Sequence, residues 1–250
     1  MLAIERRSQI LSDLEAEKRV LVSELAKKYN ITEETIRRDL DKLEKEGLLR
    51  KTYGGAVLIT NLSAELPYRV RVETNKAQKQ IIADKIYKLI GPKENIILDA
   101  SSTCVHIARK LKNKDSLTII TNSVEILMEC SGFDNINAIS TGGILRGSSL
   151  SLVGSGAAHV LNQITGDKAI ISCKGLDFNK GVMESSLDDA EIKRAMADNS
   201  RQLILAVDSS KFNRLSFAKT LDLRRVHMVV SDYVPAEWAK FFEENNIKYC

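Results

Sequence analysis

The hydrophobic rhythm of this 250-residue chain changes once, and that change constrains the fold more than any other feature. Up to about residue 46, apolar residues recur at helical spacing, and residues 22–29 carry them at i, i+3, i+4 and i+7. From about residue 76, helical stripes alternate with short apolar runs such as 95–99 and 203–207. Strands separated by helices of about 10–15 residues form mostly parallel sheets that are covered on both faces. We therefore expect a small helical domain followed by a larger α/β domain.

The first part of the chain has the outline of a winged helix-turn-helix. Three short helices are expected before Gly47, which stops the third, and Thr32 is placed to cap that helix. Gly54 and Gly55 separate β-prone segments within residues 48–57, which is typical of a hairpin. The segment after the hairpin carries little pattern and is interpreted as a linker. The expected boundaries are a winged helix-turn-helix at 1–57, a linker at 58–75 and an α/β domain at 76–250.

The third predicted helix carries a polar face opposite its buried side. With Ile36 turned toward the core, the far side presents hydroxyl, carboxylate and guanidinium groups. Guanidinium groups bind guanine edges or phosphates, and the first residues of a recognition helix meet base edges. Basic residues of the hairpin would lie over backbone phosphates. The candidate DNA-contacting residues are Thr32, Glu34, Thr35, Arg37, Arg38, Lys42, Arg50 and Lys51.

The charge balance leaves a second interpretation of this face open. The chain has 37 basic and 33 acidic residues, a net charge of +4. Residues 1–57 hold 12 basic and 11 acidic side chains, a net charge of +1. A small helical subdomain with a solvated charged face would show the same pattern. If DNA is the partner, the positive charge must be arranged on one surface, because it is absent in bulk.

The cysteines and the apolar runs indicate the cellular compartment in which the chain is expected to fold. Cys104, Cys130, Cys173 and Cys250 form no C-x-x-C pair and no cluster with histidine, which indicates a reduced, cytosolic protein without structural zinc. The N-terminus turns charged at once and lacks the pattern of a signal peptide. No apolar run approaches the roughly 18–20 residues of a membrane span. We expect no metal, no cofactor and no membrane partner.

Polar loops follow four of the predicted strands. Ligands in open parallel sheets bind at the carboxyl ends of the strands. Hydroxyls, glycines and free N–H groups at helix starts suit a phosphate, although Ser and Thr there also serve as plain helix caps. None of the loops is a P-loop or a G-x-G-x-x-G, so neither an NTP nor a dinucleotide is favoured. The loops are 99–103, 121–123, 141–143 and 208–211, the last with Lys211 as a point charge.

Four strings in the N-terminal part are distinctive. They are V-S-E-L-A at 22–26, T-I-R-R-D-L at 35–40, L-E-K-E-G-L-L-R at 43–50 and G-G-A at 54–56. Together they closely resemble the signature of the DeoR family of bacterial transcriptional regulators. The resemblance implies a winged-helix repressor domain whose T-I-R-R helix enters the major groove of operator DNA. Glu34 replaces a commonly small residue, and its carboxylate can accept from cytosine N4 or repel phosphate.

The resemblance continues in the α/β part, through segments 67–69, 99–103, 118–123, 141–143, 167–169, 193–196 and 208–212. These look like the DeoR-type C-terminal sensor domain, so the resemblance covers nearly the whole chain. It implies a three-layer, Rossmann-like α/β fold similar to ribose-5-phosphate isomerase and glucosamine-phosphate deaminase. It also implies a phosphorylated sugar or related intermediate as effector, and a homodimer or homotetramer. Ala100 stands where the family typically has Gly.

The rival interpretation is a sugar-phosphate isomerase fused to a DNA-binding domain, which needs a general base, usually a carboxylate. Isomerases carry Asp-Gly-Ala-Asp-Glu-Val-Asp after a strand, and segment 171–177 looks similar. Lys174 and Gly175 stand where the isomerases keep Asp and Glu, and Asp177 is retained but equally suits a turn. We therefore expect sensing without catalysis and assign no catalytic residue. A purely structural DNA-binding protein would not need the recurrent polar loops.

The expected function is a DNA-binding repressor of a carbohydrate-metabolism operon that a phosphorylated sugar releases from its operator. The candidate effector-binding residues are Asp99, Ser101, Ser102, Thr103, Thr121, Asn122, Ser123, Gly142, Gly143, Lys174, Gly175 and Lys211.

Overall fold

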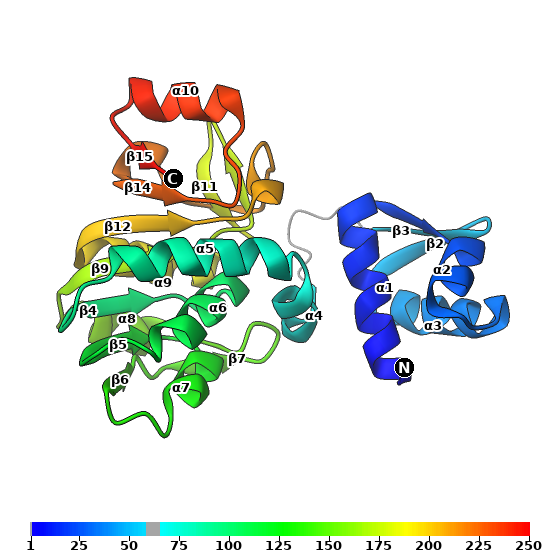
Figure 1. The fold of residues 1–250 in the computed structure, drawn as a ribbon, viewed down its shortest axis with the longest axis horizontal. Coiled ribbons are helices and arrows are strands. Elements are labelled where there is room, and N and C mark those ends of the chain that lie inside the picture. Colours follow the sequence, from blue (N-terminus) through cyan, green and yellow to red (C-terminus); the bar gives the residue numbers. More distant parts are fainter. Residues whose placement is uncertain (1, 59–65) are drawn as a thin grey trace. The chain divides into compact units, whose positions relative to one another are not determined.

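The structure is a computed structural model that describes residues 2–58 and 66–250. The chain divides into two compact units, residues 1–75 and residues 76–250 (Figure 1). Each unit is described by itself.

The N-terminal unit is a winged helix-turn-helix, as the periodicity predicts. Its described elements are the helices α1 (Ala3–Glu17), α2 (Val22–Tyr29) and α3 (Glu33–Lys45) and the strands β1 (Arg19–Leu21), β2 (Leu49–Thr52) and β3 (Gly55–Leu58). The apolar stripes of the three helices meet in one core, where Leu14, Leu25 and Ile36 are buried. Asn30 adopts a left-handed conformation at φ 53° and ends α2. Thr32 then caps α3, because its hydroxyl accepts from the Thr35 N–H at 3.3 Å.

The wing is the antiparallel hairpin of β2 and β3. Gly54 supplies the positive φ of 80° that its tight turn requires. Gly55 permits the close approach of β1, since a Cβ there would lie 2.0 Å from the Val20 carbonyl oxygen. The sheet order is β1-β3-β2. β1 was not expected from the sequence, because a strand of three residues is too short to show a period.

The segment interpreted as a linker contains a helix, which the sequence reading missed. α4 (Tyr68–Glu73) follows Pro67, and Val70 is buried in the same core as Leu14. The alternation Val70-Arg71-Val72-Glu73 has no helical period, so the pattern concealed a helix of less than two turns. Residues 59–65 of the expected linker lie outside the described residues.

The C-terminal unit is built on a parallel sheet of seven strands in the order β15-β14-β12-β9-β4-β5-β6. The strands are β4 (Asn95–Leu98), β5 (Leu117–Thr121), β6 (Ile136–Ser140), β9 (Gly166–Ile171), β12 (Ser200–Ala206), β14 (Met228–Val230) and β15 (Lys248–Tyr249). The expected doubly wound parallel sheet after a winged helix-turn-helix is confirmed.

Helices cover both faces of this sheet (Figure 1). They are α5 (Lys76–Leu89), α6 (Ser102–Leu111), α7 (Val124–Cys130), α8 (Ser155–Leu161), α9 (Leu187–Asp198) and α10 (Ala236–Glu244). α5, α6 and α7 lie on the near side in Figure 1 and α8 and α9 on the far side. Alternate strand residues such as Ile97, Ile120 and Ile171 join the core that α8, α9 and α10 complete.

Short elements complete the C-terminal unit. They are the hairpin of β7 (Ile144–Arg146) and β8 (Ser151–Val153), the antiparallel strands β10 (Gly175–Asp177), β11 (Gly181–Glu184) and β13 (Ala218–Leu221), and the 3-10 turns Ser209–Lys211 and Leu223–Arg225. Elements of three or four residues leave no periodic signal, and the sequence analysis did not anticipate them.

Candidate functional site

The outer side of α3 and the wing form one surface, which we call the recognition face. It comprises the eight residues Thr32, Glu34, Thr35, Arg37, Arg38, Lys42, Arg50 and Lys51, of which all but the half-buried Thr35 are exposed. On the opposite side of α3, Ile36, Leu40 and Leu43 are buried. The string T-I-R-R-D-L therefore alternates between core and solvent as the helical wheel predicts.

Asp39 anchors α3 from beneath. Its carboxylate is buried and accepts from Arg6 Nε at 2.5 Å, with Arg7 NH1 at 3.5 Å from its other oxygen. The two arginines of the same string, Arg37 and Arg38, point outward. This pairing with α1 fixes the orientation of α3, because a buried carboxylate needs charged partners.

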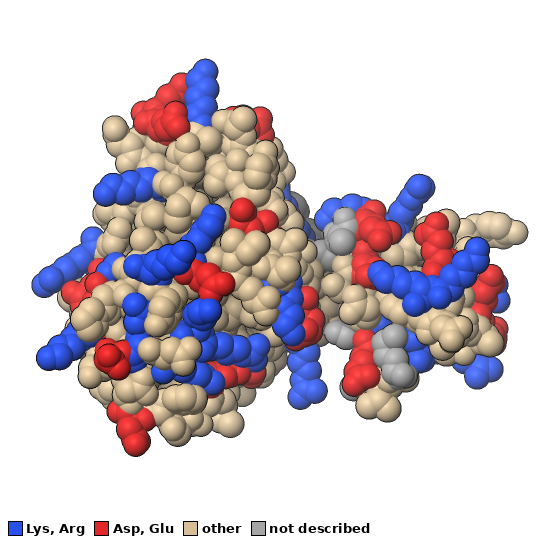
Figure 2. All heavy atoms as spheres, viewed as in Figure 1, with Lys and Arg blue, Asp and Glu red and all other residues tan. Residues whose placement is uncertain are grey.

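Carboxylates accompany the basic groups of the recognition face. Arg37 pairs with Glu33 at 2.5 Å and Arg38 with Glu34 at 3.2 Å. Lys51 of the wing pairs with Asp41. Figure 2 shows basic and acidic side chains side by side on the N-terminal unit.

The tip of the wing carries an aromatic residue that the sequence analysis did not single out. Tyr53 lies in the β2–β3 turn and is fully exposed. An aromatic ring without packing contacts at the end of a basic hairpin is an unusual surface feature. Its only sequence signal is its position, directly before the two turn glycines and after Arg50 and Lys51.

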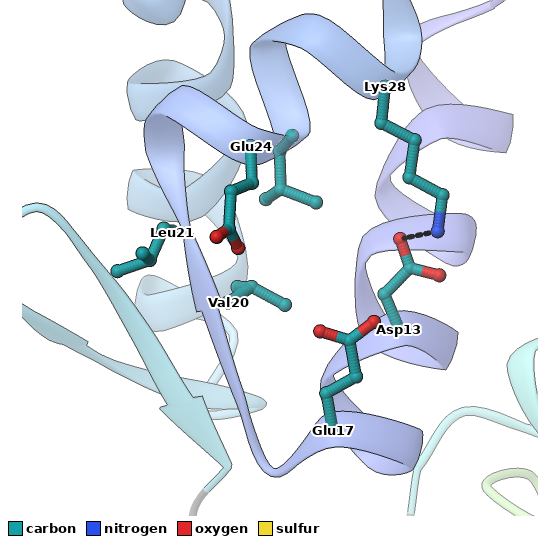
Figure 3. Close-up of a pocket in the computed structure, with 7 residues that line it drawn as sticks. Asp13, Glu17, Val20, Leu21, Glu24 and Lys28 are labelled. Carbon is teal, nitrogen blue, oxygen red and sulfur yellow. Dashed lines mark hydrogen bonds and ion pairs between the residues drawn. The ribbon is translucent and has the colours of Figure 1, made fainter.

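A small pocket lies between α1 and α2, and its polar side chains hold the two helices together (Figure 3). Asp13 on α1 accepts from Lys28 Nζ at 2.8 Å and from the Tyr29 hydroxyl at 2.6 Å. Burial and the Asp13 carboxylate raise the pKa of Tyr29 well above its usual value, so its hydroxyl remains a donor. These bonds hold the two helices together.

The sheet of the C-terminal unit reverses its winding between β4 and β9. From β4 the chain proceeds outward through β5 and β6, and it then returns to place β9 on the other side of β4. In open α/β sheets, ligands bind outside the carboxyl ends of the strands at such a reversal point. All strands of this sheet are parallel, so the predicted loops 99–103, 121–123, 141–143 and 208–211 share that edge.

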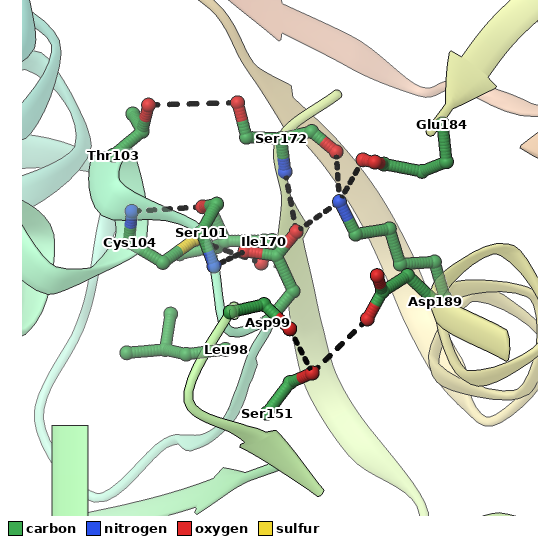
Figure 4. Close-up of polar contacts among 12 residues, drawn as sticks. Leu98, Asp99, Ser101, Thr103, Cys104, Ser151, Ile170, Ser172, Glu184 and Asp189 are labelled. Atoms are coloured by element: carbon green, nitrogen blue, oxygen red, sulfur yellow. Dashed lines mark hydrogen bonds and ion pairs between the residues drawn. The ribbon is translucent and has the colours of Figure 1, made fainter. Parts of the chain in front are cut away.

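A buried ion cluster occupies the reversal point, and Figure 4 shows it. We call Asp99, Ser172, Glu184 and Lys193 the switch-point cluster. Lys193 Nζ lies 2.8 Å from Asp99 Oδ2, donates to the Ser172 carbonyl at 2.7 Å and pairs with Glu184. Asp99 also accepts from the N–H groups of Ser172 at 2.9 Å and Ser101 at 3.0 Å.

Opposing influences set the charges of this cluster. Burial alone would raise the pKa of Asp99, but the Lys193 charge and hydrogen bonds from Cys104, Lys193 and Ser101 outweigh it and lower that pKa. Burial alone would lower the pKa of Lys193, but Asp99 and Glu184 hold it well above the usual range. Both groups are therefore charged at neutral pH. Glu184 and Lys193 were missed as site residues, because positions 184 and 193 meet residue 99 only in the folded sheet.

The hydroxyl groups of the loops after β4 and β5 mostly form hydrogen bonds within the protein. Ser101 Oγ caps α6 through Cys104 N–H at 3.1 Å, and Thr103 Oγ1 lies 3.5 Å from Ser172 Oγ, whereas Ser102 is simply buried. Thr121 donates to the Leu98 carbonyl at 2.7 Å, and Ser123 Oγ accepts from Ile126 N–H at 3.2 Å to cap α7.

Asn122 and the two glycines after β6 shape the same edge. Asn122 Nδ2 donates to the Leu152 carbonyl at 3.0 Å, and its buried Oδ1 has no hydrogen-bond partner within the described chain. Gly142 and Gly143 adopt φ values of 60° and 113°. A Cβ on Gly143 would lie 2.6 Å from the Val153 carbonyl, so glycine is required for β8 to approach.

Lys211 lies in the 3-10 turn Ser209–Lys211, in the loop that follows β12, as predicted. Its side chain is 17% exposed, and Nζ lies 3.9 Å from Asp208 Oδ2. Burial would raise the pKa of Asp208, but Lys211, a hydrogen bond from Ser210 and the charge of Lys79 lower it. Lys79 was not predicted as a site residue, and it is only 4% exposed on α5. The signal was a lysine three residues before Ile82, on the buried stripe of that helix.

The isomerase-like segment lies beside β9 with a different role for each residue. The Lys174 N–H donates to the Met183 carbonyl at 2.9 Å, which extends the pairing of β10 with β11. A Cβ on Gly175 would lie 2.0 Å from the Arg214 carbonyl, so Gly175 serves a close approach of backbone. Asp177 accepts from the N–H groups of Asn179 and Lys180 at 2.9 and 2.8 Å, the bonds of a turn residue.

The β7–β8 hairpin is tied to the same helix as Lys193. Arg146 pairs with Asp189 at 2.5 Å, and Ser151 Oγ donates to the other Asp189 oxygen at 3.1 Å. Asp189 and Lys193 are four residues apart on α9 and share one face of it. The hairpin and the switch-point cluster are thus linked through one helical turn.

A winged helix-turn-helix docks on DNA, and the reversal point of a doubly wound sheet is where such sheets bind small molecules. The two units together are typical of a DNA-binding regulator that senses a small molecule. The comparison with family models agrees. The model of the DeoR-like helix-turn-helix domain matches residues 6–61, and that of the DeoR C terminal sensor domain matches residues 74–233. The chain belongs to the DeoR family of transcriptional regulators, so it binds DNA and carries an effector domain.

Curated relatives match over nearly the whole chain. YulB, an uncharacterized HTH-type transcriptional regulator of Bacillus subtilis (strain 168), is 40% identical over 93% of this chain and 90% of its own. The transcriptional repressor AccR of Agrobacterium fabrum is 31% identical over 91% and 89%. The L-fucose operon activator of Haemophilus influenzae is 33% identical over 97% of each chain.

Among solved structures, ribose 5-phosphate isomerase A from Methanocaldococcus jannaschii is similar over 55% of each chain, with 17% identity and a TM-score of 0.42. No helix within the described residues is long and apolar enough to cross a membrane. The described residues also contain no group of three His, Cys, Asp or Glu side chains arranged to hold a metal ion.

Proposed function

We propose that the chain represses a gene cluster of carbohydrate metabolism and that a phosphorylated sugar releases it from its operator. The observation that carries this proposal is the carboxyl edge of the parallel sheet, where residues 101–103 begin α6 after β4 and Lys211 lies in the 3-10 turn after β12. Free N–H groups of a helix start and a lysine together suit a phosphate. The name of the L-fucose operon activator supports a sugar-related role.

The two ends of such an effector would meet different groups. We place the phosphate at residues 101–103 and Lys211, with Asp99, the loops 121–123 and 142–143 and residues 174–175 around the rest of the ligand. Hydroxyl groups of a sugar fit the buried Asn122 Oδ1, because an unsatisfied buried acceptor gains from a donor. Release then follows from linkage, since a ligand that prefers the conformation of lower DNA affinity shifts the population toward it.

The protein is proposed to sense rather than to isomerise. An enzyme of this kind needs a carboxylate free to move a proton. Two carboxylates lie at the sheet edge, but Asp99 and Glu184 are both engaged by Lys193. Burial raises the pKa of the Cys173 thiol to about 12, so it is protonated at neutral pH and a poor nucleophile.

On the DNA side, α3 is proposed to enter the major groove while the wing contacts phosphates. Two copies of the chain, as a homodimer or within a homotetramer, would align two such helices on repeated half-sites. Light scattering of the purified protein measures the oligomeric state directly.

Two experiments test the proposal. A thermal-shift screen compares ribose 5-phosphate, fructose 6-phosphate and glucose 6-phosphate with the unphosphorylated sugars. A bound effector raises the melting temperature, because a concentration of 100 Kd stabilises the native state by about 2.7 kcal/mol. The absence of a shift with any sugar phosphate would overturn the proposed sensing, and measurable isomerisation of one of them would favour the enzyme instead.

The second experiment concerns the recognition face. Arg38→Ala should weaken binding to a duplex selected from a random pool by the wild-type protein, by about tenfold or more if Arg38 reads a base. Arg225→Ala is the matched control, because Arg225 is also an exposed, ion-paired arginine. Equal affinities for Arg38→Ala and the control would reject this assignment. A reporter gene behind the selected duplex distinguishes repression from activation.

A further inference from the structure

Three basic side chains of the recognition face are already paired within the protein. Arg37 and Arg38 bind the carboxylates of Glu33 and Glu34, one turn earlier on α3. Lys51 reaches from the wing to Asp41 on the same helix. The surface expected to meet a polyanion thus carries its own anions beside its cations (Figure 2).

These pairs differ from the structural ion pair beneath them. The side chains of Arg38 and Glu34 are 78% and 63% exposed, whereas those of Arg6 and Asp39 are 10% and 5% exposed. Exposed pairs are weak and exchange readily, because water and salt screen both charges. The outer pairs therefore contribute little to the fold, and their cations can be drawn to another anion.

We propose that Glu33, Glu34 and Asp41 compete with DNA phosphates for these basic side chains and thereby raise sequence discrimination. Non-specific binding to DNA is almost entirely electrostatic. On any duplex, each phosphate must displace a carboxylate or approach it, which weakens this term. A loss that is equal on all duplexes would leave specificity unchanged. On the preferred sequence the arginines of α3 turn to base edges, so fewer phosphates compete with the carboxylates, and the loss is smaller there than on other sequences.

The proposal accounts for the charge of the N-terminal unit. A DNA-binding segment with 12 basic and 11 acidic residues has little bulk attraction for DNA. The local balance is set by Glu34 on the recognition face and by Glu33 and Asp41 beside it, because charges separated by more than about 10 Å are largely screened at 0.1 M salt. The inference rests on this face meeting DNA, which Arg38→Ala tests separately.

The test removes the three negative charges and keeps the shapes. The triple variant Glu33→Gln, Glu34→Gln, Asp41→Asn and the wild type are titrated with two 30-base-pair probes by fluorescence anisotropy. One probe is the duplex selected from a random pool by the wild type, and the other is the unselected pool. We expect the variant to bind the pool about tenfold tighter and the selected duplex less than threefold tighter, so the specificity ratio falls. The tenfold gain corresponds to about 1.4 kcal/mol.

Salt dependence supplies a readout that a purely structural role would not change. Each phosphate that a basic residue neutralises contributes about −0.9 to the slope of log K against log salt concentration. The variant should therefore show a steeper slope on the pool by about one to three such increments. Circular dichroism confirms that α3 remains folded, and the single variant Glu34→Gln serves if the triple variant is unstable.

A matched control separates placement from net charge. Asp198→Asn, Asp222→Asn, Glu244→Gln removes three carboxylates of exposed ion pairs in the C-terminal unit. Its affinity for the pool should stay within twofold of wild type. Equal tightening by both triple variants would overturn the proposal in favour of bulk charge. An unchanged specificity ratio for the recognition-face variant would overturn it too, as would loss of affinity for the selected duplex alone, which would mean that the carboxylates read bases.

Discussion

Lys193 Nζ on α9 lies 2.8 Å from Asp99 Oδ2 at the end of β4, and both side chains are buried. The same ammonium pairs with Glu184 at the end of β11. One side chain thus joins the central strand, the helix on the far face and the small antiparallel sheet. An effector that binds at the carboxyl edge, as proposed above, would act on a cluster that connects these three parts of the unit.

Removing the Lys193 ammonium should lower the free energy of unfolding substantially. Lys193→Ala leaves two buried carboxylates without their cation, and breaking a buried ion pair in this way costs about 3–5 kcal/mol. Thermal or urea unfolding of the purified variant measures the loss. The triple variant Lys193→Met, Asp99→Asn, Glu184→Gln is the control, because it removes the charges together and should lose less. A loss below about 1 kcal/mol for Lys193→Ala would contradict the role given to this cluster.

Asp99 also predicts a direction for acid unfolding. Its pKa is lowered in the folded protein, because Lys193 and the hydrogen bonds outweigh the effect of burial. A carboxyl with a depressed folded pKa stabilises the fold above its unfolded pKa of about 3.9, and that contribution is lost as the pH falls through the folded pKa. Melting temperatures of wild type and Asp99→Asn should therefore differ most above about pH 5 and converge toward pH 3. A difference that grows on acidification would contradict this sign.

The long periodic elements could be predicted from the sequence, and the switch-point cluster could not. Ile36, Leu40 and Leu43 mark α3 through their spacing alone, and the loop 99–103 follows an apolar run that reads as a buried strand. The partners of Asp99 come from positions 184 and 193, and only the strand order brings them together. The spacing of residues along the chain does not indicate contacts between positions so far apart in the sequence.

Two other misses have local reasons. Lys79 occupies a core position on the stripe of α5, and a lysine there interrupts the apolar pattern instead of marking a site. α4 is too short for a helical period, so Val70 gave no sign that it belongs to the core of the N-terminal unit. A charged residue at a core position of a predicted helix can therefore indicate a functional site.

Lys211→Ala should abolish the response to the sugar phosphate that the thermal-shift screen identifies. A hydrogen bond to a charged group contributes about 1.5–3 kcal/mol, so the affinity for the sugar phosphate should fall by about 10- to 100-fold. Binding to the selected duplex should persist, since the variant leaves the recognition face intact. Lys240→Ala, an exposed lysine on α10, is the control. A normal response from Lys211→Ala would place the phosphate elsewhere.

Tyr53 should contribute to DNA affinity without contributing to stability. Its side chain is fully exposed at the wing tip, so Tyr53→Ala removes no packing and should leave the melting temperature within about 1 °C, as for most surface substitutions. We expect affinity for the selected duplex to fall several-fold, and Tyr53→Phe shows how much of that the hydroxyl supplies. Tyr233→Ala, another exposed tyrosine, is the control in the C-terminal unit. Unchanged affinity for Tyr53→Ala would remove the wing tip from the interface.

The boundary between the units predicts which fragments fold. Residues 76–250 contain the complete parallel sheet and its core, so this fragment should unfold cooperatively and keep its thermal shift with the sugar phosphate. The N-terminal unit should need α4, because Val70 lies in its core. Fragment 1–75 should therefore be more stable than fragment 1–57 by about 1.5–3 kcal/mol, the value of burying one such side chain. Val70→Ala should lower the stability of fragment 1–75 part of the way toward that of fragment 1–57. Equal stability of the two fragments, measured by urea unfolding, would restore residues 58–75 to the status of a plain linker.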